Sequence, residues 1–344
     1  MFRSVQSRRN GARIALCLMS GFRFLTVHDA VHAQTKERQV RQISGIEHVR
    51  DATALIPAAM SSSGILAISR AELSAMDLFD QSGHFVGRIP RPQDQLSLVA
   101  PAHVAITPKG EILALDSRSD RLGYYALRGK DVVLRRVQQL DNSYADFCVL
   151  GRSLVMFTPE AGGRLDLLPL EQRASRRSIQ LSSRRSVIEQ PLNEGRLACD
   201  TDKQLIIFAN SLDGSVRAFN LTQDKHWSVK IHDLKLPRVD LEAGRSIQII
   251  PPAGAFHSLI QCVSVGHGVV LAQYMIHASR VPTWGEMAPI LTVAIGITNG
   301  REVARTSTLP LIIAAAKRKI AYLGSSGHLI VDSTSIFVKP LPYQ

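Results

Sequence analysis

The sequence predicts an all-β protein, a six-bladed β-propeller of four-stranded antiparallel blades. From residue 34 onward, runs of four to eight residues rich in Ile, Val, Leu and Phe recur between clusters of Gly, Pro, Asp and Ser, which is typical of short antiparallel strands. Six of these runs are separated by 47, 42, 51, 63 and 52 residues, and periods in this range indicate propeller blades. The runs begin at Ile65, Ile112, Leu154, Leu205, Gly268 and Ile320.

Two of the repeated units contain the same four elements in the same order. The second unit predicts strands over residues 103–107, 111–116, 121–127 and 131–138, and the fourth over 196–200, 204–209, 215–221 and 226–231. The gaps hold no crossover helices, which excludes parallel βαβ units. The turns between strands contain residues that tolerate a positive φ, as tight hairpins require. They are Pro108-Lys109-Gly110, Gly162-Gly163, Asp213-Gly214 and Asn299-Gly300.

The first 33 residues have the order of an export signal. Residues 1–13 hold four arginines and no acid, a short apolar run covers 14–21, and Val31 and Ala33 precede the predicted cleavage site. We therefore expect a signal peptide over 1–33, a single propeller domain over 34–344, and a periplasmic or secreted protein. Arg8 and Arg9 leave a twin-arginine route open, and an attached basic helix is the structural alternative.

Ring closure in a propeller requires a strand from outside the last unit, because an open ring leaves exposed strand edges. Residues 39–47, with Val40, Ile43 and Ile46, are the candidate. Residues 237–258 contain Pro251-Pro252 and are expected to form a linker. Strands in that stretch would leave a seven-bladed ring open as an alternative.

Composition excludes two broad classes. Hydrophobic residues make up 45% and charged residues 20% of the chain, which is too apolar for a disordered protein. No apolar stretch of about 18 residues occurs, so no membrane span is expected once the signal is removed. The net charge is +12 for the full chain and +8 after removal of the signal, because 36 basic and 28 acidic residues remain. This excess of basic residues favours anionic partners.

Three cysteines remain after the signal is removed. Cys148, Cys199 and Cys262 each lie six residues before an apolar run, in three consecutive units. An odd number cannot form a complete disulfide framework, and no C-x-x-C spacing indicates a metal site. We expect buried thiols on first strands that line the axis, where small side chains pack.

Residues 64–140 carry a family pattern. Phe79-Asp80-Gln81-Ser82-Gly83 ends an apolar strand, Ala100-Pro101 lies in the following loop, and Asp116 ends the next strand. This sequence pattern resembles that of the NHL-type six-bladed β-propellers, which include many secreted bacterial proteins. After residue 140 only the strand spacing matches, and Phe157-Thr158, Phe208-Ala209 and Leu323-Gly324 replace the usual Val-Ala-Asp ending.

The fifth unit contains a long insertion between its second and third strands. Trp, Tyr and Arg are common anchors of recognition, so this hairpin is the candidate ligand-binding segment. The alternative is an extended hairpin that packs its Trp on its own blade. The candidate residues are Tyr274, His277, Arg280 and Trp284.

A second candidate is an arginine-rich segment at the end of the third unit. Guanidinium groups form bidentate contacts with oxyanions, so the segment is a candidate contact for an anionic surface such as an anionic glycan. Nucleic acid is not expected, because aromatic residues do not interleave with the arginines. The alternative is a solvated edge strand whose charges oppose strand pairing. The residues are Arg173, Arg176, Arg177, Arg184 and Arg185.

No motif assigns catalytic or metal-binding residues or a cofactor. His257, His267 and His277 lack H-x-H or H-E-x-x-H spacing, and no nucleophile elbow or P-loop occurs. Asp116 and Asp200 follow strand ends, as turn residues do. The sequence therefore favours an extracytoplasmic binding or scaffold protein that recognises a ligand or protein partner on an axial face. The alternative is a metal-dependent hydrolase or lyase with an axial active site, because related propellers of gluconolactonase and amidating-lyase type carry such a metal.

Overall fold

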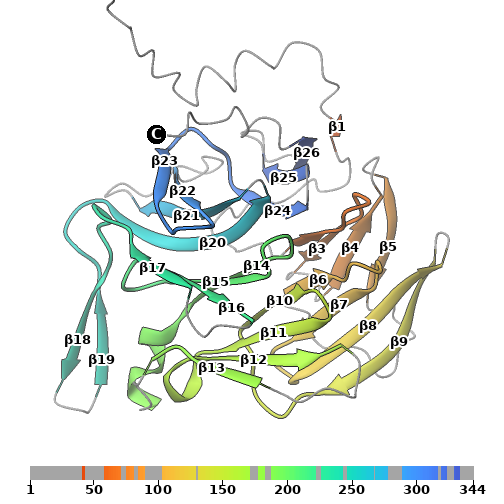
Figure 1. Ribbon diagram of the computed structural model, residues 1–344, viewed down its shortest axis with the longest axis horizontal. Coiled ribbons are helices and arrows are strands. Elements are labelled where there is room, and N and C mark those ends of the chain that lie inside the picture. The colour runs from red at the N-terminus through yellow and green to blue at the C-terminus, as the bar shows by residue number, and fades with distance from the viewer. Residues whose placement is uncertain are drawn as a thin grey trace, which may run out of the picture.

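A computed structural model describes residues 41–42, 58–70, 75–80, 84–89, 103–128, 131–170, 177–182, 187–221, 226–242, 246–266, 268–277, 289–316, 319–323 and 329–333 (Figure 1). Antiparallel strands dominate these ranges, together with the short 3-10 helices η2 (Glu160–Gly162) and η3 (Val187–Asn193). The predicted all-β class is confirmed. Within the described ranges, no helix has the length and hydropathy needed to cross a membrane.

Five blades consist of four consecutive strands that pair antiparallel from the axis outward. Blade I is β2 (Ala58–Met60), β3 (Leu66–Arg70), β4 (Ala75–Phe79) and β5 (Phe85–Ile89). Blade II is β6 (His103–Ile106), β7 (Ile112–Asp116), β8 (Arg121–Arg128) and β9 (Asp131–Gln139). Blade III is β10 (Asp146–Leu150), β11 (Ser153–Thr158), β12 (Arg164–Pro169) and β13 (Arg177–Gln180). Blade IV is β14 (Gly195–Asp200), β15 (Leu205–Asn210), β16 (Ser215–Asn220) and β17 (Trp227–Lys230). Blade V is β20 (Phe256–Gly266), β21 (Val269–His277), β22 (Ile290–Gly296) and β23 (Glu302–Thr306).

The remaining four-stranded sheet is built differently, and we call it the closing sheet. It contains β24 (Ile312–Ala316), β25 (Lys319–Leu323) and β26 (Leu329–Ser333), and β26 pairs with β1 (Arg41–Gln42) from the other end of the chain. The prediction of six blades is thus corrected to five blades of consecutive strands, because the fourth strand of the last sheet is β1, from the other end of the chain. β1 lies within the segment 39–47 that was predicted to close the ring.

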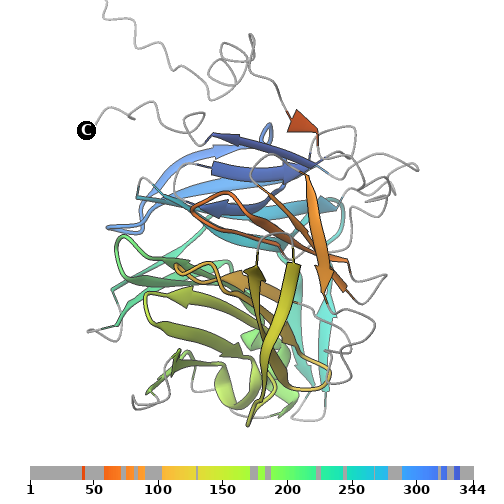
Figure 2. The ribbon, with the colours of Figure 1, turned by 90° about the vertical axis from the view of Figure 1, so that its right-hand side faces the viewer.

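The inner strands form a closed cycle of contacts. β2 contacts β6, and the sequence continues through β10, β14, β20 and β24 back to β2. In Figure 2 the closing sheet, in blue, lies beside blade I, in orange. The described chain therefore has a propeller arrangement around an axis.

The predicted strand positions are confirmed in detail in the second and fourth units. Blades II and IV match the expected strands to within a residue or two at each end. The second strands β7 and β15 are buried along their full length, because neighbouring sheets cover both faces. Gly110 (φ 82°) and Gly214 (φ 67°) have the positive φ expected for these hairpins.

The stretch 237–258 is more than the predicted linker. It contains the two-stranded hairpin β18 (Arg238–Glu242) and β19 (Ser246–Ile250), which pairs with no blade and stands away from the other sheets in Figure 1. Two strands cannot complete a seventh blade. The stretch instead adds a projection between blades IV and V.

The expectation of three free thiols is wrong for two of them. Cys148 on β10 and Cys199 on β14 form a disulfide with a Cα–Cα distance of 5.8 Å, while Cys262 on β20 is free and buried. Equal register on the inner strands of adjacent blades brings the first two cysteines together across 51 residues of sequence.

Candidate functional site

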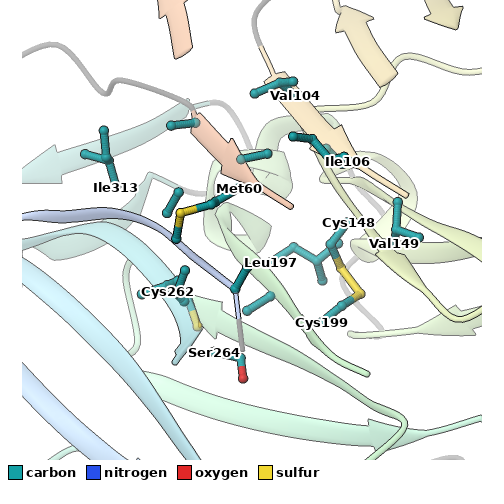
Figure 3. A pocket seen from close by; sticks show the side chains of 18 of the residues that line it. Met60, Val104, Ile106, Cys148, Val149, Leu197, Cys199, Cys262, Ser264 and Ile313 are labelled. Atoms are coloured by element: carbon teal, nitrogen blue, oxygen red, sulfur yellow. A yellow bond between two sulfur atoms is a disulfide. The ribbon is translucent and has the colours of Figure 1, made fainter. Parts of the chain in front are cut away.

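A cavity of about 450 Å³ follows the axis, and we call it the axial channel. Its wall comes from all six inner strands, β2, β6, β10, β14, β20 and β24, with adjoining residues. Figure 3 shows Met60, Leu197, Ile313 and the Cys148–Cys199 disulfide around it. A cavity of this size is in the range that takes small molecules, about 300 to 1,000 Å³.

Three polar residues line one end of the channel, which we call the polar mouth. His103 and Asp146 are the first residues of β6 and β10, and Arg196 is the second residue of β14. His103 Nδ1 lies 3.4 Å from Asp146 Oδ1. Three adjacent blades thus each supply one polar side chain at the start of the inner strand.

Backbone groups hold the Asp146 carboxylate in place. The N–H of Phe147 donates to Oδ1 at 2.8 Å, and the N–H of Leu197 on the next blade donates to Oδ2 at 3.0 Å. Burial, the largest influence on Asp146, raises its pKa. The hydrogen bond and charge of His103 lower it, helped by Arg196 and Leu197, so that the pKa falls below its ordinary value of 3.8. Asp146 therefore stays ionised and orients the His103 ring.

Arg196 lies half-buried between blades IV and V. Its Nε donates to the carbonyl of Ile260 at 2.9 Å, and Nη1 lies 3.5 Å from the carbonyl of Gly195. Within the part of the chain that the structure describes, no carboxylate forms an ion pair with it. Gly195 packs closely on β15 of its own blade, where an added Cβ would lie 2.3 Å from the Ala209 carbonyl oxygen.

The channel wall on β20, β24 and β2 is mainly apolar, although Gln261 and Ser264 on β20 also line it. Met60, Ile260, Leu311 and Ile313 line it and belong to one buried cluster that joins blade V, the closing sheet and blade I. In the cycle of inner strands these three lie opposite β6, β10 and β14. The mouth of the channel is therefore polar on one side and apolar on the other.

The opposite end of the channel holds turn residues, and a free thiol lines the channel wall. Asp200 accepts hydrogen bonds from the Lys203 N–H and from Ser264 Oγ, the latter at 2.7 Å, which confirms its predicted turn role. Burial raises the pKa of Cys262 to about 12, so this thiol is unreactive. Among the described residues, no three His, Cys, Asp or Glu side chains are grouped to hold a metal ion.

The two predicted hairpin residues that the structure describes, Tyr274 and His277, do not line the channel. Tyr274 is 0% exposed in the core between blades IV and V, where burial raises its pKa. His277 stacks on Phe256 at a centroid distance of 4.4 Å, and its Nε2 lies 2.6 Å from Ser258 Oγ. Arg280 and Trp284 lie outside the described residues, so a ligand contact by the loop stays a prediction.

Of the predicted arginine segment, the structure describes Arg177. It begins β13, is exposed, and donates to the carbonyl of Leu221. Arg173, Arg176, Arg184 and Arg185 lie outside the described residues, as does His267. Contact with an anionic surface stays a prediction.

Sequence reasoning missed the polar mouth. His103, Asp146 and Arg196 are separated by 43 and 50 residues and form no local motif. One signal was available, because each begins or nearly begins a first strand in consecutive units. Comparing equivalent positions of those units for polar residues would have found all three.

No protein-family model and no curated protein matches the chain. Similar solved structures include virginiamycin B lyase from Staphylococcus aureus, 9% identical, covering 80% of this chain and 94% of that one with a TM-score of 0.45. Others are U3-55K, 10% identical over 80% and 79% of the two chains with a TM-score of 0.49, and a nidogen/laminin complex, 11% identical over 73% and 78% with a TM-score of 0.47. These likenesses carry no argument about function. The strand order and the ring of inner strands define the class, a β-propeller with an axial channel.

We expect Asp146→Asn to lower the free energy of unfolding by about 2 kcal/mol near neutral pH, because the amide leaves a buried N–H without an acceptor. The lowered pKa means that the stabilisation by Asp146 is present above pH 3.8 and is lost as the pH falls through the folded-state value. Urea unfolding at several pH values should therefore show the variant and the wild type converging in acid.

The control is Asp202→Asn, which changes an exposed carboxylate in the turn after β14. It should alter the free energy of unfolding by less than about 0.5 kcal/mol at any of these pH values. A constant difference between Asp146→Asn and the wild type down to strong acid would contradict the assignment.

Proposed function

We propose that the protein is an extracytoplasmic binding protein that takes a small ligand at the polar mouth of the axial channel. The observation that carries the proposal is the placement of His103, Asp146 and Arg196 on one side of a cavity of about 450 Å³ with an apolar opposite wall. Mostly apolar cavities with a few fixed polar groups are the usual form of small-molecule sites.

Binding at the mouth is tested by thermal shift with a panel of organic acids, amines, sugars and nucleosides. At least one chemical class should raise Tm in a saturable way. His103→Trp should obstruct the mouth and weaken that binding by at least about tenfold. The matched variant His232→Trp makes the same substitution at an exposed histidine outside the channel lining and should leave binding unchanged. Equal loss in both variants, or no ligand at all, would refute the proposal.

The ring is further proposed to be of NHL type, with the closing sheet completing it after the five blades. The contacts of β24 with both β20 and β2 support closure of the ring at this sheet. In this arrangement β1 supplies the fourth strand, and no inner strand is left without two neighbours.

We also infer export, with cleavage after Ala33. The signal-like order of residues 1–33 supports export, and so does the Cys148–Cys199 disulfide, because structural disulfides persist in oxidising compartments. Protein recovered from the periplasm of a bacterial host should begin at Gln34 by mass spectrometry.

The same material should contain one titratable thiol after denaturation, from Cys262, because Cys17 leaves with the signal. The Cys262→Ala variant should contain none. An uncleaved N-terminus, or three thiols in wild-type protein, would contradict export and oxidation respectively.

A further inference from the structure

We propose that the axial channel binds a small amphipathic organic anion, with its carboxylate at Arg196 and its hydrocarbon part against the wall formed by β20, β24 and β2. This assignment rests on the proposed function and names the chemical class of the ligand. Three features of the polar mouth lead to it.

The first feature is the state of Arg196. Its contacts in the described chain are the two backbone carbonyls of Ile260 and Gly195, which fix the guanidinium in the wall without neutralising it. A guanidinium keeps its charge at any ordinary pH, and it binds carboxylates through paired N–H donors. A half-buried cation that faces a cavity, and that forms no ion pair with any carboxylate of the described residues, favours an anion there.

The second feature is that Asp146 does not serve as the ion-pair partner of Arg196. Its two oxygens already accept from Phe147 N–H, Leu197 N–H and His103 Nδ1. These contacts use the carboxylate for holding blades III and IV together and for orienting His103. Because Nδ1 faces Asp146, the other ring nitrogen of His103 is the one left for a ligand.

The third feature is the apolar side. β14, which carries Arg196, lies three places from β2 in the cycle of six inner strands, so the strand across the axis from it belongs to the wall of β20, β24 and β2. Ile260 and Ile313 continue that wall. An inorganic anion would contact Arg196 but not the apolar wall. A carboxylate with a hydrocarbon chain would contact both.

The test uses octanoate as the probe and isothermal titration calorimetry on the full mature protein. Octanoate should bind one to one, and hexanoate should bind more weakly by roughly fourfold per methylene removed. The neutral probe 1-octanol, the cation octylamine and inorganic phosphate should each bind at least about tenfold more weakly than octanoate.

Arg196→Gln should weaken octanoate at least about tenfold while keeping a donor for the Ile260 carbonyl. The matched control Arg301→Gln removes an exposed arginine in the turn before β23 and should bind like the wild type. If Arg196→Gln does not fold, the affinities of wild-type protein for octanoate, octanol and octylamine decide whether the channel requires a negatively charged ligand.

Equal affinity for octanoate and octanol, or unchanged octanoate binding by Arg196→Gln, would overturn the anion assignment. No octanoate binding would also overturn it. In these cases another probe that loses affinity in His103→Trp and keeps it in His232→Trp would leave the proposed binding function supported. If no probe binds at the polar mouth, both the anion assignment and the proposed binding function are overturned.

Discussion

The requirement that the inner strands close a ring governs the rest of this structure. Each sheet can bury its middle strands only between two neighbours, and the cycle from β2 through β24 gives every inner strand two of them. The link between the chain ends is the pairing of Arg41 with Val331 and of Gln42 with Ile330. Closure of this kind removes exposed strand edges, which otherwise template aggregation.

Specific polar contacts hold neighbouring blades in register. Trp227 Nε1 donates to the Ile297 carbonyl at 2.6 Å between blades IV and V, and Gln261 Nε2 donates to the Ile313 carbonyl at 3.2 Å between blade V and the closing sheet. The polar mouth belongs to the same set of contacts. Asp146 and Arg196 both bond to the next blade, so the groups that fix the ring also place charge at the end of the channel.

Much of the fold could be predicted from the sequence, because strand length, turn chemistry and repeat spacing are local properties. The strands of blades II and IV follow directly from such patterns. What could not be predicted depends on which units are neighbours. Cys148 and Cys199 share a register, yet only the ring shows that their strands are adjacent. The same holds for His103 and Asp146, which meet across two blades without a motif.

Ring closure by β1 is the central claim, and replacement of residues 39–47 by a Gly/Ser segment of equal length tests it most directly. Replacement of residues 34–38 is the control. The account predicts that the first replacement lowers Tm by roughly 5 °C or more and promotes aggregation through the exposed β26 edge, while the control does neither. An unchanged Tm for both proteins would contradict closure through the N-terminal strand.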